Sequence, residues 1–159
     1  MNIVSTVVGG WASLYNDHKL VLGTVLFGHF VGLLVGGGAA VGFDLATLRL
    51  RGATAAHRAA HLAQLPSVHR TVVAGLTVSI VSGILMTLSD ASTFLTSPVF
   101  WAKMLILALL AANGAMLTRG VPQDAVTERT WSRTTRSATF SLALWLAATL
   151  AGVVLATTA

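Results

Sequence analysis

Four apolar segments, each long enough to cross a lipid bilayer, constrain this chain more than any other feature of its sequence. A helix needs about 20 mostly apolar residues to cross the hydrocarbon core. No segment alternates apolar and polar residues at period two, so helices are predicted rather than barrel strands. The composition agrees, with 55% hydrophobic and 9% charged residues in a chain of 159. The predicted spans are residues 20–43, 71–88, 98–117 and 137–156.

We therefore predict an all-α polytopic membrane protein, a single domain over residues 1–159 that forms an antiparallel bundle of four transmembrane helices in the lipid bilayer. The net charge of +5 indicates no nucleic-acid partner, because the basic residues cluster at the ends of apolar runs. By the positive-inside rule, the two loops that carry them are predicted to be cytoplasmic and both termini to lie outside. These residues are Arg49, Arg51, Arg58 and Arg70 in the first loop and Arg119, Arg129, Arg133 and Arg136 in the second.

The segments outside the spans carry weaker helical signals. Residues 3–15 place apolar side chains at spacings of three and four, which predicts a short interfacial helix anchored by Trp11 and Tyr15. A disordered arm is the alternative interpretation. The stretch 53–65 is rich in helix formers and is predicted to be helical, with Pro66 at the start of the second span.

Small residues recur at intervals of four in three of the spans. Lipid gives little hydrophobic incentive for helix association, so such residues usually mark contacts where two backbones approach closely. A second interpretation is that the glycines leave space for a flat group such as a porphyrin, which would make Gly32 and Gly36 part of a cofactor site. The series are Gly28, Gly32 and Gly36 in span one, Gly75, Ser79 and Gly83 in span two, and Ala143, Ala147 and Ala151 in span four.

Two ionisable residues lie well within the spans, His29 in the first and Lys103 in the third. Such a residue costs about 2.5 to 3.5 kcal/mol on insertion scales, so each suggests a function. At 1.5 Å per residue, His29 lies about 13 Å and Lys103 about 7 Å below the outer ends of their spans, so the two side chains can meet at one depth. The structural alternatives are a hydrogen-bonded histidine and a lysine that reaches back to the surface.

A neutral imidazole is a common axial ligand of haem iron, and helix bundles hold haem between side chains of facing helices. His29 is therefore the candidate iron ligand. Met86, near the outer end of the second span, is one candidate for the second position. Otherwise the iron is five-coordinate and Lys103 pairs with a propionate. His69 is predicted on the opposite side of the bilayer, too far away to share a haem with His29.

The remaining polar residues give weaker indications. His57 and His61 are four residues apart, a spacing that can hold a metal ion, but a solvated or headgroup-facing pair is the simpler interpretation. Asn113 in the third span is predicted to form an interhelical hydrogen bond. The five acidic residues all lie near predicted span ends or in loops, which argues against a proton-driven carrier.

The chain resembles the HemJ-type protoporphyrinogen oxidases and the related CopD-like copper-resistance membrane domain. The likeness rests on His29 in the first span and on Lys103 in the run PVFWAKMLILALLAANGAML (98–117). In the HemJ group such a histidine and lysine accompany a b-type haem, which implies cofactor binding by His29 and a catalytic role for Lys103. The resemblance also implies the bacterial cytoplasmic membrane. The chain departs from the HemJ pattern at 42–51 (GFDLATLRLR), which lacks the proline-arginine pair of that group.

Three functional hypotheses follow. The first is a membrane protein that binds b-type haem for redox chemistry, as a porphyrin-type oxidase or an electron carrier. The second is a non-catalytic accessory or structural subunit of a larger membrane complex or homo-oligomer, in which the small-residue faces dock on a partner. The third is CopD-like copper handling, for which a chain without cysteine offers few soft ligands.

Overall fold

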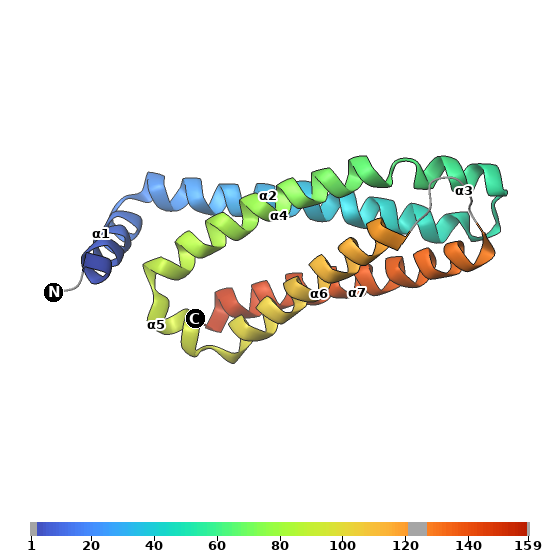
Figure 1. Ribbon diagram of the computed structural model, residues 1–159. Helices are drawn as coiled ribbons and strands as arrows, with labels where there is room; N and C mark the ends of the chain where they lie inside the picture. Colours follow the sequence, from blue (N-terminus) through green and yellow to red (C-terminus); the bar gives the residue numbers. More distant parts are fainter. Residues whose placement is uncertain (1–2, 121–126, 159) are drawn as a thin grey trace.

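The protein is helical throughout the part of the chain that the computed structural model describes, residues 3–120 and 127–158 (Figure 1). No strand occurs in these residues, so the all-α prediction is confirmed. The elements are α1 (Ile3–Asp17), α2 (Lys19–Arg49), the 3-10 helix η1 (Leu50–Gly52), α3 (Ala55–Leu62), α4 (Leu65–Ser89), α5 (Ala91–Thr96), α6 (Pro98–Gly120) and α7 (Glu128–Thr158).

Within the described residues, four helices are long and apolar enough to cross a membrane, namely α2, α4, α6 and α7. Figure 1 shows that α2 and α4 lie together, as do α6 and α7, and α2 also packs against α7. The amino terminus, α5 and the carboxyl terminus lie at one end of the bundle, which we call the terminal end (Figure 1). The opposite end, called here the arginine-rich end, contains η1, α3 and the beginning of α7.

The spanning helices are all longer than their predicted apolar windows, as the ends of α2 and α7 at the arginine-rich end show. The window 20–43 lies in a helix that ends at Arg49, and the window 137–156 lies in one that begins at Glu128. Hydropathy marks only the part of a helix suited to lipid, whereas backbone hydrogen bonding continues through polar residues. At the arginine-rich end, Phe43 of α2 and Trp131 in the extension of α7 belong to one buried cluster with Leu62 and Leu65.

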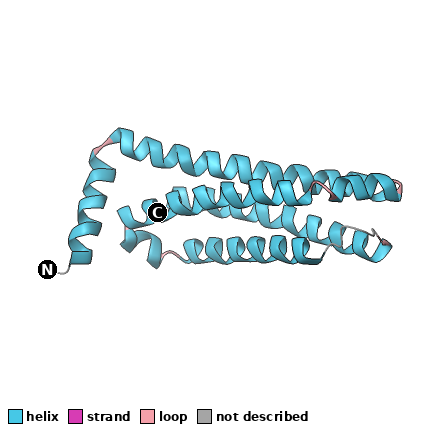
Figure 2. Ribbon diagram, turned by 45° about the horizontal axis from the view of Figure 1, so that its top comes forward, coloured by secondary structure: helices cyan, strands magenta, loops and turns pink. Residues whose placement is uncertain are grey.

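The amino-terminal segment is a helix, so the prediction for 3–15 is confirmed over the alternative of a disordered arm. Figure 2 shows α1 running across the terminal end at a steep angle to α2. The Trp11 indole N–H donates to the Leu85 carbonyl of α4 at 2.8 Å. Tyr15 is only 7% exposed, and this burial raises the pKa of its hydroxyl. Both aromatic residues thus hold α1 on the bundle, where the sequence suggested anchors in the membrane interface.

The backbones of α2 and α4 touch at a set of small residues. A Cβ atom added to Gly75 would lie 2.5 Å from the Gly36 nitrogen and 2.6 Å from the Gly32 oxygen. Likewise, a Cβ atom on Gly32 would lie 2.8 Å from the Ser79 nitrogen. The packing interpretation is therefore confirmed for these four residues. Gly28 does not follow this prediction, because a Cβ atom there would meet nothing within 4 Å. In the span-four series, Ala143 is exposed, and Ala147 and Ala151 are only half-buried.

The outer surface of the bundle is largely apolar. In α6, Leu110 is the one buried residue, and large side chains of every spanning helix face outward. Such a surface is unfavourable in water but suits the hydrocarbon core of a bilayer. Examples are Phe27, Phe30 and Leu34 of α2, Ile80 and Ile84 of α4, Trp101 and Leu105 of α6, and Leu146 and Leu150 of α7.

Replacing Gly75 with alanine should destabilise the bundle by about 1–3 kcal/mol, because the added methyl group forces the touching backbones apart. Gly28→Ala is the matched control on the partner helix, and it should leave stability unchanged or slightly improve it, since its methyl group meets no neighbour. Thermal unfolding of the detergent-solubilised protein, followed by circular dichroism, measures both. Equal melting temperatures for the two variants would contradict the α2–α4 contact.

Candidate functional site

His29 lies between α2 and α4 and is held by hydrogen bonds. Its Nδ1 atom is 2.9 Å from the Ser79 carbonyl oxygen and 3.2 Å from the Ser82 hydroxyl. A Cβ atom on Gly83 would lie 3.5 Å from the imidazole ring, at ordinary contact distance, so the ring lies directly beside this part of α4. His29 is thus hydrogen-bonded to a neighbouring helix, as the structural alternative predicts. These bonds involve only Nδ1 and do not account for the second ring nitrogen, Nε2.

The hydrogen bond to Ser79 fixes the tautomer of His29. A carbonyl oxygen can only accept, so Nδ1 carries the proton and Nε2 carries the lone pair. Nε2 forms no hydrogen bond with any residue that the structure describes. Histidine ligands of metals are usually oriented in this way, with one ring nitrogen donating to a backbone carbonyl and the other free to bind.

Lys103 projects from α6 toward α7. Its Nζ atom would lie 3.5 Å from a Cβ atom on Gly152, about 9 Å from the end of α7 at 1.5 Å per residue. The side chain is half-buried, and within residues 3–120 and 127–158 it forms neither a hydrogen bond nor an ion pair. The ammonium group nevertheless interacts electrostatically with His29. The structure thus places a half-buried ammonium group, unpaired in the described residues, where its charge acts on the imidazole of His29.

Met86 lies on the face of α4 that contacts His29, one turn beyond Gly83 toward the terminal end, and is half-buried. The cofactor role predicted for Gly32 and Gly36 is contradicted, because the α4 backbone fills the space beside both glycines. The glycines that border the candidate side chains are instead Gly83 and Gly152. We use "the imidazole–lysine site" for His29, Lys103, Gly83 and Gly152.

The bundle consists of two helix pairs that are joined mainly through α2 and α7. Helix α4 packs mainly on α2, and α6 packs mainly on α7, with little contact between α4 and α6. Two pockets, of about 390 and 300 Å³, are lined by residues nearer the arginine-rich end, among them Arg51 and His61 respectively. Neither of these pockets is lined by His29 or Lys103.

The two histidines of the predicted pair, His57 and His61, differ in how deeply they are buried. His57 is exposed and bonded to Thr54, as a solvated residue is expected to be. His61 is 8% exposed, stacks on Phe43 with ring centroids 4.2 Å apart, and has Nε2 2.8 Å from the Thr47 hydroxyl. The prediction of a solvated pair is thus wrong for His61, because α3 folds back onto the extended part of α2.

Asp44 is the functional candidate that the sequence argument missed. It is 5% exposed and faces the Ser141 hydroxyl of α7, and its Oδ2 atom is buried without a hydrogen-bond partner. The inference that all acidic residues lie at span ends or in loops is wrong here, because α2 continues past Asp44 and α7 covers it. A usable signal existed in the polar residues Asp44 and Thr47 of α2 and Thr134 and Ser141 of α7, which recur at helical spacing.

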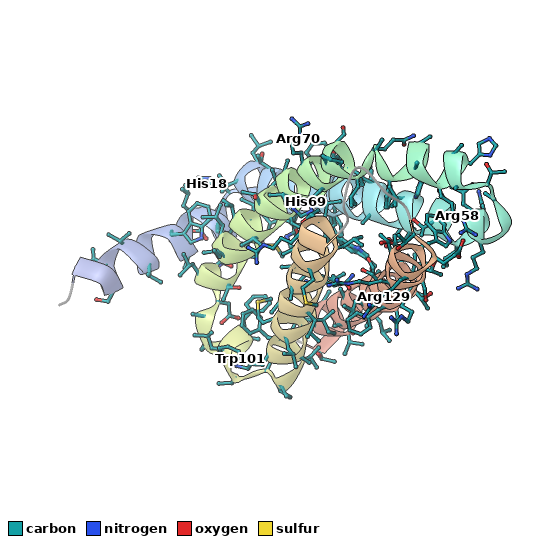
Figure 3. The ribbon with its side chains drawn as sticks, turned by 45° about the vertical axis from the view of Figure 1, so that its right-hand side comes forward. His18, Arg58, His69, Arg70, Trp101 and Arg129 are labelled. Carbon is teal, nitrogen blue, oxygen red and sulfur yellow. The ribbon has the colours of Figure 1, made fainter. Side chains whose placement is uncertain are left out.

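Other polar residues pair as structural groups. Asn113 of α6 donates to the Ser137 carbonyl of α7 at 3.3 Å and accepts from the Ser137 hydroxyl at 2.9 Å, which confirms the predicted interhelical bond. At the arginine-rich end, Arg58 forms an ion pair of 2.7 Å with Glu128 and lies 5.0 Å from the Trp131 ring centroid. These contacts tie α3 to α7, and Figure 3 shows Arg58 at this end of the molecule.

At the terminal end, Asp90 caps α5 and is fully exposed. Hydrogen bonds from the hydroxyl and backbone N–H of Thr93, and from the Ser92 hydroxyl, hold the pKa of its carboxyl below the usual range. The Thr93 backbone N–H donates to the Asp90 Oδ1 atom at 3.2 Å. His69 lies on α4 beside α6 (Figure 3), with its ring 3.8 Å from where a Cβ atom on Gly114 would be. His69 is thus separated from His29 along the bundle, as predicted.

The described ranges contain no group of three or more histidine, cysteine, aspartate or glutamate side chains that could hold a metal ion. No protein-family model, curated protein or solved structure matches the chain. The resemblance to the HemJ and CopD-like groups therefore stays a prediction, and the geometry of the site carries the functional argument.

Replacing Lys103 with methionine should stabilise the protein by about 1 kcal/mol, since an apolar side chain of similar length removes an unpaired cation from a membrane span. Lys19→Met, at the exposed start of α2, is the control and should have no effect. Melting temperatures of the purified variants provide the measurement. Destabilisation by Lys103→Met would show that the ammonium group has a structural partner, and the site interpretation of Lys103 would fail.

Proposed function

We propose that this membrane protein binds a b-type haem through His29 and serves in redox chemistry. The observation that carries the proposal is the imidazole of His29, whose Nδ1 donates to the Ser79 carbonyl while Nε2 has no partner in the described chain. An imidazole held in this way is oriented for a metal before the metal arrives. When bound, a haem supplies one-electron redox chemistry that no side chain of this protein provides.

Lys103 supports the proposal through its charge. A half-buried ammonium group without an ion-pair partner in the described residues is suited to an anionic ligand. A haem propionate meets this requirement, and so does a carboxylate of a porphyrin-type substrate. In either case Lys103 would position the ligand by direct contact, from a place beside Gly152 of α7. Met86 would be the candidate for a second ligand of the haem iron, because it shares a face of α4 with the neighbours of His29.

The direction of insertion belongs to the same proposal. Arginines cluster at one end of the bundle, and the positive-inside rule places that end in the cytoplasm of a bacterium. Both termini then lie outside the cytoplasmic membrane. The imidazole–lysine site lies in the half of the bundle nearer the termini, so it would face the outer half of the bilayer.

An accessory subunit is the second candidate function, favoured by one observation. Helix α6 has a single buried residue, Leu110, and leaves Trp101, Leu105 and Met116 exposed. A helix whose side chains are so little buried by its own bundle can pack against a partner in a membrane complex. Copper handling finds no comparable arrangement of ligands in the described chain.

An absorption spectrum of the purified protein tests the haem proposal. We expect a Soret band that is lost in His29→Ala and retained in His57→Ala, because His57 is exposed and faces no other helix. Lys103→Met should keep the band but weaken haem affinity about fivefold, the effect of about 1 kcal/mol from one partly exposed ion pair. A wild-type protein without a Soret band after reconstitution with haem, or His29→Ala with the full band, would refute the proposal.

The same preparations distinguish the accessory-subunit hypothesis. If the chain serves only as a subunit, it should migrate with partner proteins in native gels of its own membrane, and His29→Ala should leave that migration unchanged. Migration as a free monomer or dimer counts against this hypothesis.

A further inference from the structure

Asp44 is a buried carboxyl group that the haem proposal does not use. Its Oδ2 atom has no hydrogen-bond partner, and the only polar side chain found against the carboxyl group is Ser141, within the residues that the structure describes. A buried charge normally has an ion-pair partner, and a buried carboxyl group without one is much less costly when it carries a proton. The carboxyl group therefore needs a cation or a proton.

The space around the carboxyl group favours a proton over a metal cation. Oδ2 is closed to water, and neither pocket is lined by Asp44. A sodium or potassium ion requires several oxygen ligands and room of its own. A proton requires neither, because it converts the carboxylate into a neutral acid of nearly the same size.

The basic groups nearby are turned to other partners. On α7, the Arg133 guanidinium lies against Gly120 of α6, and Arg136 lines a pocket together with Arg51 of η1. On α3, Arg58 pairs with Glu128. The described chain contains no ion pair to Asp44. We use "the polar seam" for the buried polar residues Asp44 and Thr47 of α2 and Thr134 and Ser141 of α7. His61 of α3, which contacts Thr47, is the titratable side chain that can exchange a proton with this seam.

His61 connects this seam to the outside. The Thr47 hydroxyl donates to the Phe43 carbonyl, so Nε2 of His61 must donate to Thr47. Nδ1 then carries a lone pair and forms no hydrogen bond in the described residues. His61 also lines the open pocket of about 300 Å³ with Gln64 at the arginine-rich end. Thr47 lies three residues from Asp44, on the same side of α2.

We propose that Asp44 is a proton-binding site and that His61, hydrogen-bonded to Thr47 one turn along α2, takes up the proton when Asp44 releases it and passes it to water at the arginine-rich end. Asp44 and Thr47 share no hydrogen bond in the described residues, so this exchange requires a movement of their side chains. Imidazole is suited to such a relay because it can take up a proton at one nitrogen and release one from the other. Carboxyl groups of this kind mark proton pathways in membrane proteins. The site is independent of haem, so its failure and that of the proposed function are distinguishable.

Infrared spectroscopy of the full chain, labelled with ¹³C-aspartate and reconstituted in lipid, tests the binding site. At about pH 6, where ordinary aspartates are ionised, the wild type should show the carbonyl band of a protonated labelled carboxyl group. The band should vanish in Asp44→Asn and persist in Asp90→Asn, because hydrogen bonds keep Asp90 ionised. Absence of the band from the wild type, or its survival in Asp44→Asn, overturns the proposal.

A second variant covers the case in which Asp44→Asn does not fold. Ser141→Ala removes the hydroxyl group that faces Asp44, so the band should change frequency. An unshifted band would assign the protonated carboxyl group to another aspartate and overturn the proposal.

Exchange into heavy water tests the relay. His61→Gln should slow the isotope shift of the Asp44 band several-fold, since glutamine fills a similar space but cannot pass a proton between two ring nitrogens. His57→Gln is the matched control, because His57 is exposed on the same helix and should exchange at the wild-type rate. Exchange of His61→Gln at the wild-type rate overturns the role of His61.

Discussion

The contact between the backbones of α2 and α4 is the constraint on which the rest of the structure depends. Gly32, Gly36 and Gly75 let the two helices approach until carbonyl and amide groups of one meet Cα atoms of the other. In a bilayer, such dispersion contacts replace the hydrophobic effect as the main source of helix association. The contact also fixes the rotation of α2 about its axis, and that rotation decides which side chains of α2 face α4 and which face α7.

Both polar sites follow from this rotation. His29 lies one turn before Gly32 and therefore faces α4, where its ring is hydrogen-bonded to the Ser79 carbonyl and lies beside Gly83. Asp44 is fifteen residues later, about 22 Å along the axis, and faces Ser141 of α7. One helix thus carries the imidazole near the terminal end and the carboxyl group near the arginine-rich end. A change in the tilt or rotation of α2 would move both groups.

Hydropathy and residue spacing were sufficient to predict the architecture, but they could not predict which neighbouring helix each side chain contacts. The four spans, the loop helix and the interhelical role of Asn113 follow from local sequence, because apolar length, helix formers and a lone amide each have one simple solution in lipid. Asp44 and His61 do not, because their burial depends on how far α7 extends and on where α3 folds back. The sequence also placed His29 and Lys103 at one depth, but it could not identify Gly83 and Gly152 as their neighbours, since that requires the register between helices.

The pairing of polar groups separates structural residues from candidate functional ones in this protein. Asn113 satisfies both ends of its amide with Ser137, and Arg58 finds Glu128. The chain can therefore pair a polar side chain when the role is structural. The Lys103 ammonium and the Asp44 Oδ2 atom lack such partners in the described residues, although each lies within a helix long enough to span the membrane. Unpaired polar groups in lipid lower stability, and a fold that retains them gives up that stability for a ligand or a proton that completes the pair.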